Sequence, residues 1–158
     1  MSTSTSIRDF VQADVTEALI DEAMPLLEAH WREISHYPDI PLSVDRDAYV
    51  AAARAGFVRA YLCREDGALR GYAVYFVRRH LHYTTSLTAV QDVLYLAPEL
   101  RGQALGAAFI QWCDEQLWAE GVQVVTHHVK LAHDFGPTLA ALGYEQVEAM
   151  WQRRLDRG

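Results

Sequence analysis

The residues best suited to binding an anion lie in the sequence LYLAPELRGQALG, from Leu94 to Gly106. An apolar run stops at Pro98, a polar turn carries Arg101 and Gly102, and a helical pattern follows at once. The first turn of a helix leaves backbone N–H groups unpaired, and together with the helix dipole they bind phosphate well. Gly102 permits a close approach to an anion, and Arg101 adds a charge-assisted contact. The segment predicts a phosphate-binding turn.

Ala104 stands where such a turn often carries a third glycine. If residue 104 already lies in the first helical turn, it needs right-handed dihedral angles, which alanine adopts better than glycine. We therefore expect a right-handed Ala104 whose backbone N–H remains available to a phosphate group.

Asp92 is a candidate general base within the predicted strand 89–96. Strand alternation would place it on the same face as Leu94 and Leu96, with Gln91 facing the other way. A solvated or hydrogen-bonded strand aspartate is the competing interpretation of this residue.

Five of the seven histidines occur in two groups that could take part in proton transfer. His80 and His82 alternate on one predicted strand, whereas His127 and His128 are adjacent, so only one of the latter pair can face a cleft. Histidine titrates near neutral pH, so either His127 or His128 could be an acid or base. A hydrogen-bonded or surface role is the alternative for each histidine. Spacing shows no converging ligand set, so we expect no metal.

Composition limits the class of protein. The 158 residues suit one domain, 1–158, and no apolar run has the length of a membrane span. The N-terminus lacks an apolar signal core, and Cys63 and Cys113 form no metal motif, so we expect a cytoplasmic protein with reduced thiols. A net charge of −7 argues against nucleic-acid binding and permits a cationic amine substrate.

The predicted elements alternate in a way that indicates a mixed sheet flanked by helices. A capping box at Asp14 and Glu17 predicts the start of the first helix, which Pro25 should kink or divide. An Asp-Gly pair indicates a hairpin. Expected strands cover residues 7–11, 58–63, 69–83, 89–96, 122–130 and 148–155; the later helices cover 45–55, 105–117 and 137–143.

This element order, with Arg101-Gly102-Gln103-Ala104-Leu105-Gly106 at the start of the third helix, resembles the GCN5-related N-acetyltransferase (GNAT) family. The family pattern there is Arg/Gln-x-x-Gly-x-Gly/Ala, after a strand that ends in a Leu-Tyr-Val-like segment and a proline. The sequence LAALGYEQV, residues 139–147, is similar to the family's Leu-Gly-Phe turn. The resemblance covers about residues 6–155 in element order. A simple strand-to-helix turn is the alternative, because glycine-rich turns are common.

The resemblance implies an α/β fold with a splayed mixed sheet of six to seven strands and about four helices. It also implies acetyl-coenzyme A as cofactor, bound where a bulge splays the fourth strand from the fifth. The residues implied in cofactor binding are Leu94, Tyr95 and Leu96 at the pantetheine arm, Arg101, Gly102, Gln103, Ala104, Leu105 and Gly106 at the pyrophosphate, and His133 near the thioester.

The implied activity is acetyl transfer to an amine by direct attack, with Asp92, His128 and His133 as catalytic candidates. Many relatives use a tyrosine acid where this chain has Leu139. In the family, the connection between the first two helices forms part of the acceptor pocket. The acceptor-binding candidates are His36, Tyr37 and Asp39, with His82 and Tyr83 facing them; for the first three, an exposed loop is the alternative.

Three interpretations of the function remain open from the sequence. The first is an N-acetyltransferase acting on a small-molecule or protein amine, with a homodimer possible because dimers are common in the family. The second is a protein that binds or senses acyl-coenzyme A without catalysis, which Leu139 motivates. The third is a GNAT-like protein that modifies nucleobases, which the net charge of −7 counts against.

Overall fold

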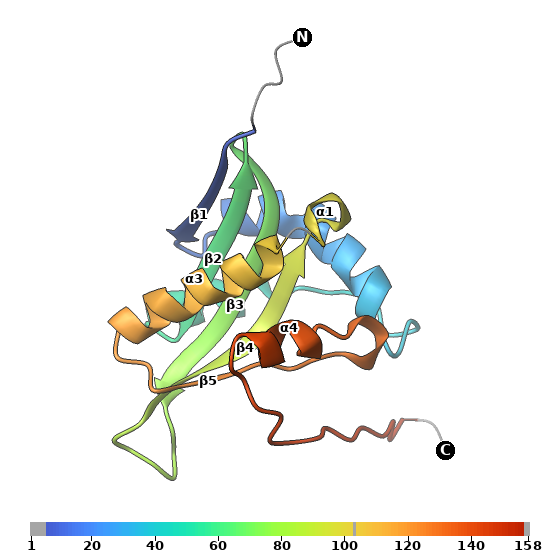
Figure 1. Ribbon diagram of the computed structural model, residues 1–158. Helices are drawn as coiled ribbons and strands as arrows, with labels where there is room; N and C mark the ends of the chain where they lie inside the picture. The colour runs from blue at the N-terminus through green and yellow to red at the C-terminus, as the bar shows by residue number, and fades with distance from the viewer. Residues whose placement is uncertain (1–5, 103, 157–158) are drawn as a thin grey trace.

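One mixed β-sheet forms the centre of the computed structural model, which describes residues 6–102 and 104–156 (Figure 1). Its strands lie in chain order: β1 (Arg8–Ala13), β2 (Val58–Glu65), β3 (Ala68–Arg79), β4 (Leu87–Leu96) and β5 (Val124–Thr126). The first four pair antiparallel, whereas β5 joins β4 in parallel. The Asp-Gly hairpin joins β2 to β3, as predicted.

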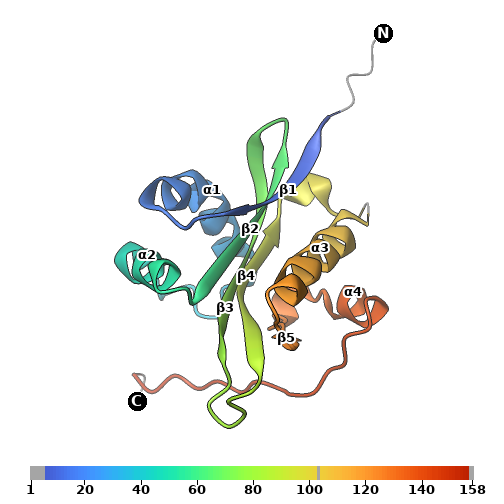
Figure 2. The same cartoon turned by 90° about the vertical axis from the view of Figure 1, so that its left-hand side faces the viewer.

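Four α-helices cover the two faces of this sheet. Helices α1 (Glu17–Ile34) and α2 (Arg46–Arg54) lie on one face, and α3 (Leu105–Ala119) and α4 (Gly136–Ala141) lie on the other (Figure 2). Two short 3₁₀ helices, η1 (Pro98–Leu100) and η2 (Leu131–His133), precede α3 and α4. One apolar cluster packs between the sheet and α3, and a second packs between the sheet and α1.

The start of α1 differs from the predicted capping box. Thr16 is the N-cap, and its side chain accepts a hydrogen bond from the Leu19 N–H at 3.1 Å, so the helix begins at Glu17. Pro25 lies inside α1, which continues as one helix to Ile34. The expectation of two joined helices is therefore wrong.

The sheet has five strands among the described residues, so the prediction of six to seven is wrong. β5 spans three residues instead of the predicted 122–130, and residues 148–155 form no strand. After α4 the chain runs to the other side of the molecule, where Arg154 bonds Asp39 at 3.1 Å (Figure 2). The alternating apolar residues of this segment therefore meet no sheet edge, and Trp151 is 92% exposed.

Candidate active site

The gap between β4 and β5 is the feature that organises the candidate site. The two strands pair only where Thr88, Ala89 and Val90 meet Val124, Val125 and Thr126. From residue 91 to residue 96, no described strand pairs with this edge of β4. The backbone groups on that edge therefore have no strand partner and can bind an extended ligand, except the Leu96 carbonyl, which accepts from Arg101 Nε.

A β-bulge at Asp92 changes which side chains share a face of β4. Val74 of β3 pairs with Val93 and the next residue, Tyr75, pairs with Gln91, so Asp92 is the extra residue. Leu94 packs against the α3-side cluster, whereas Asp92 bonds to α2 on the opposite face of the sheet. The prediction that Asp92 shares a face with Leu94 and Leu96 is therefore wrong, because one inserted residue reverses the alternation.

Gln91 takes the buried position that Asp92 leaves. It is 5% exposed, and its Oε1 accepts a hydrogen bond from His127 Nδ1 at 3.0 Å. His127 packs between the rings of Tyr75 and Tyr144, and burial lowers its pKa to about 4. His127 is therefore neutral at pH 7 and packs against the core residue Tyr75.

The three predicted catalytic residues meet in one small cavity of about 50 Å³. Asp92 comes from β4, His128 from the segment after β5, and His133 from η2. The other residues that line the cavity are His30, Ile34, Gln91, Leu94, Lys130 and Phe135. Of the adjacent pair 127 and 128, His128 is thus the one that faces the candidate site.

His30 is a cavity residue that the sequence analysis missed. It is 8% exposed, its Nδ1 lies 2.9 Å from the Tyr72 hydroxyl, and its ring lies 5.1 Å from that of Tyr95. Burial lowers its pKa to about 4, so the ring is neutral at pH 7. The available signal was its helical spacing with Leu27 and Ile34, which places a polar side chain on the inward face of α1.

The N-terminus of α3 carries the partial positive charge of the helix dipole, which suits a phosphate group. Ala104 is the N-cap residue, no side chain of a described residue caps the helix, and no acidic residue lies in its first turn. The first described intrahelical bond runs from the Ala108 N–H to the Ala104 carbonyl, so the N–H groups of Leu105 and Gly106 have no partner among the described residues. Gln103, also predicted to bind the cofactor, lies outside the described residues.

Ala104 adopts a left-handed conformation, with φ of 57°, so the expectation of right-handed dihedral angles is wrong. Gly102, two residues earlier, has φ of 80°, and a Cβ added there would meet nothing within 4 Å. The chain leaves η1 and turns into α3 through these two left-handed residues, which occupy the tight connection between both helices.

Arg101 joins the turn to α1 and β4. Its Nη2 donates to both carboxylate oxygens of Glu33 at 2.9 and 3.0 Å, and its Nε donates to the Leu96 carbonyl at 2.8 Å. The guanidinium also lies over the Tyr95 ring, 5.2 Å from the centroid. These contacts fix the turn beside β4; direct contact of Arg101 with pyrophosphate stays a prediction.

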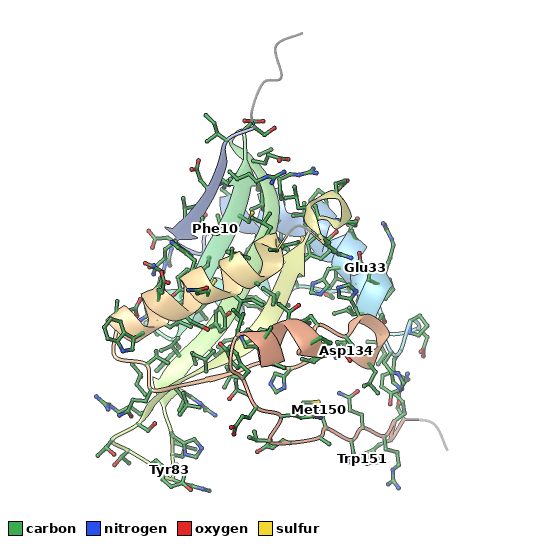
Figure 3. All side chains as sticks on the ribbon, viewed as in Figure 1. Phe10, Glu33, Tyr83, Asp134, Met150 and Trp151 are labelled. Atoms are coloured by element: carbon green, nitrogen blue, oxygen red, sulfur yellow. The ribbon has the colours of Figure 1, made fainter. Side chains whose placement is uncertain are left out.

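The predicted acceptor residues form two separate groups. The first group is His36, Tyr37 and Asp39. Arg154 pairs with Asp39 and lies over the Tyr37 ring, and the Tyr37 ring contacts that of His36. The second, which includes Tyr83, packs on itself in the connection between β3 and β4. Figure 3 shows Tyr83 at the far end of that connection, well apart from Glu33 and Asp134. None of the described contacts joins His82 or Tyr83 to residues 36–39.

Two further searches concern only the described residues. No group of three His, Cys, Asp or Glu side chains is arranged to hold a metal ion there. No helix in the same residues is long and apolar enough to cross a membrane.

Comparison with known families identifies the class of protein. The Acetyltransferase (GNAT) family matches residues 17–135, which include both diverging strands and the cavity. The chain therefore belongs to the GNAT acetyltransferase family. No curated protein matches the chain at a significant level.

Solved structures with little sequence identity share the fold. An aminoglycoside acetyltransferase from an uncultured soil metagenomic sample, in complex with sisomicin, has a TM-score of 0.73 and 11% identity, over 94% of this chain and 97% of that one. A predicted acetyltransferase with acetyl-CoA from Clostridium acetobutylicum has a TM-score of 0.66 and 10% identity, over 94% and 97%. A ribosomal-protein-alanine N-acetyltransferase from Brucella melitensis biovar Abortus 2308 has a TM-score of 0.64 and 15% identity, over 96% and 99%.

Proposed function

We propose that this chain transfers the acetyl group of acetyl-coenzyme A to the amine of a small-molecule acceptor. The observation that carries the proposal is the divergence of β4 from β5 beside the uncapped start of α3, with an acid–base cavity at the divergence. Membership of the GNAT acetyltransferase family supports the reaction class. A neighbour in the same fold was solved with acetyl-CoA, which supports the donor.

The residues at the gap fit coenzyme A. The edge of β4 from Leu94 through Tyr95 to Leu96 has no strand partner and offers backbone groups to a pantetheine arm, although the Leu96 carbonyl already accepts from Arg101 Nε. Gly102 offers open space, and residues 104–106 offer a helix N-terminus, to a pyrophosphate. Acetyl-coenzyme A would supply the activated acetyl thioester; the chain supplies orientation and proton transfer.

Asp92 is the proposed base. Its carboxylate lies in the cavity, where it would accept a proton from the acceptor's ammonium group and leave a neutral amine to attack the thioester. His128 and His133 line the same cavity and are the proposed donors of the proton that the leaving sulfur requires. Leu139, at the usual tyrosine position, is buried in α4 and has no ionisable group.

A small cationic amine is the proposed acceptor. A neighbouring structure holds sisomicin, and this chain has a net charge of −7, which attracts cations. We assign the acceptor side to the loop with His36, Tyr37 and Asp39, which Arg154 holds in place. His82 and Tyr83 lie in the other group, so they would contact only an extended acceptor.

Thiol release from acetyl-coenzyme A tests this function. The panel comprises sisomicin, other aminoglycosides, polyamines and peptides with an N-terminal alanine. We expect release with at least one small amine and a loss of about a hundredfold or more in kcat for Asp92→Asn. Tight coenzyme A binding without release on any amine would instead identify a protein that senses acyl-coenzyme A. Full activity of Asp92→Asn would remove the base assignment.

A further inference from the structure

A hydrogen bond from α2 reaches the proposed base. The Tyr49 hydroxyl donates to Asp92 Oδ2, across 43 positions in the sequence. Burial and this hydrogen bond both raise the pKa of Tyr49, so its hydroxyl stays protonated and remains a donor throughout the neutral range. Asp92 Oδ1 has no hydrogen-bond partner among the described residues, which leaves it free for a ligand.

Helix α2 holds Tyr49 in a fixed position without contributing to the core. Neither apolar cluster of described residues contains a residue of α2, and none of its residues is buried. Asp45 caps the helix by accepting from the Ala48 N–H at 2.9 Å. The Tyr49 ring stacks on Phe76 of β3, with centroids 6.3 Å apart and 26° between planes. The polar contact of α2 with β4 is thus made through Tyr49.

The bulge explains why Asp92 needs a positioning residue. Asp92 is the residue that has no partner in the β3–β4 register, so strand pairing does not fix its side chain. A carboxylate with one oxygen bound has fewer accessible rotamers and keeps the second oxygen in one direction.

We infer that Tyr49 is a positioning residue for deprotonation of the acceptor: it holds Asp92 Oδ2 so that Oδ1 receives the proton from the acceptor's ammonium. The inference rests on the proposed function, because it concerns the same base. In this step the N–H bond of the ammonium breaks and an O–H bond forms at Oδ1, while the amine nitrogen keeps the electron pair. The Tyr49 proton stays on its oxygen throughout.

Other ionisable groups face Asp92 and contribute to its field. They are His30 from α1, Tyr72 from β3, His128 and Lys130 from the segment after β5, and His133 from η2. None of them belongs to α2, so replacing Tyr49 leaves their positions unchanged. The effect of that replacement can therefore be assigned to the hydrogen bond.

Tyr49→Phe removes the hydroxyl and keeps the ring that stacks on Phe76. We expect kcat to fall about tenfold at pH 7, because the Asp92 carboxylate is no longer held in one direction. The KM for acetyl-coenzyme A should not change. Tyr61→Phe is the matched control, because the Tyr61 hydroxyl has no hydrogen-bond partner among the described residues and the Tyr61 ring packs edge-on against Trp112 on the α3 side. That control should leave kcat unchanged.

A measurement without acceptor keeps the inference testable whether or not an acceptor is found. Carboxyl ¹³C NMR at pH 7 reports the surroundings of the Asp92 carboxylate in the free protein, and its resonance should move in Tyr49→Phe and not in Tyr61→Phe. An unchanged resonance overturns the role of Tyr49 regardless of turnover. Asp92→Asn tests the base separately: if that variant retains full activity, the proposed function fails even where the Tyr49 result holds.

Discussion

Replacing Ala104 with glycine should stabilise the protein, against the usual effect of glycine near a helix. Ala104 has φ of 57°, a left-handed conformation that costs an L-residue about 1–2 kcal/mol and costs glycine nothing. Against this gain, glycine lowers the free energy of unfolding by about 0.4–1 kcal/mol relative to alanine, because it gives the unfolded chain more conformational freedom. The Ala104 side chain is exposed, so its removal opens no cavity. The expected net gain is about 0.5–1 kcal/mol.

Urea denaturation without ligand measures this gain. A gain of 1 kcal/mol corresponds to a rise in Tm of about 2–4 °C for a chain of this size. Ala108→Gly is the matched control, because Ala108 is also exposed but lies inside α3. The same substitution there should cost about 1 kcal/mol. The two variants should thus shift the urea midpoint in opposite directions at an unchanged m-value.

A loss of stability in Ala104→Gly similar to that of Ala108→Gly would refute this reasoning. It would mean that residue 104 has right-handed dihedral angles in solution, as the sequence pattern suggested. The phosphate-binding turn would then begin one residue earlier, and the unpaired N–H groups would point in a different direction.

Other predictions concern pH, packing and the cofactor turn. Burial lowers the pKa of His30 and His127 to about 4 from 6.5, so the unfolded chain takes up their protons first as pH falls. The free energy of unfolding should therefore fall between pH 6.5 and 4 by about 1.4 kcal/mol per pH unit for each histidine. In urea titrations, His127→Gln should reduce that slope by the contribution of one histidine. Gly71→Ala should destabilise by about 2 kcal/mol or more, because its Cβ would lie 2.6 Å from the Tyr95 carbonyl oxygen; an unchanged urea midpoint would contradict this. Arg101→Glu should weaken coenzyme A binding at least tenfold in calorimetry, because it breaks the ion pair with Glu33 of α1 and adds a negative charge to the turn. Equal affinity would exclude Arg101 from the phosphate-binding turn.

Local patterns predicted the elements that short-range chemistry determines. The Asp-Gly hairpin and the helix that begins at Leu105 both depend on residues that are close in sequence, whereas anion binding by the turn before α3 stays a prediction. The assignment of Asp92, His128 and His133 to one place followed from the family resemblance, and the cavity brings all three together. Their chemical roles stay predictions.

The features that were missed depend on contacts between distant segments. The bond from Tyr49 to Asp92 joins α2 to β4, and the bond from His30 to Tyr72 joins α1 to β3. Neither pair has a spacing that sequence periodicity can detect. The missing sixth strand has the same cause, since residues 148–155 have a suitable pattern but no edge beside them.

The β-bulge at Asp92 gives a physical reason why a glutamine at position 91 is followed by an aspartate at position 92. Without the bulge, Asp92 would point into the α3-side cluster, where an unpaired carboxylate costs several kcal/mol. The bulge leaves that position to Gln91, a neutral amide that His127 satisfies, and turns the charged group to the cavity and the Tyr49 hydroxyl. A single extra residue thus places the neutral amide of Gln91 in a buried position and the carboxylate of Asp92 in the cavity.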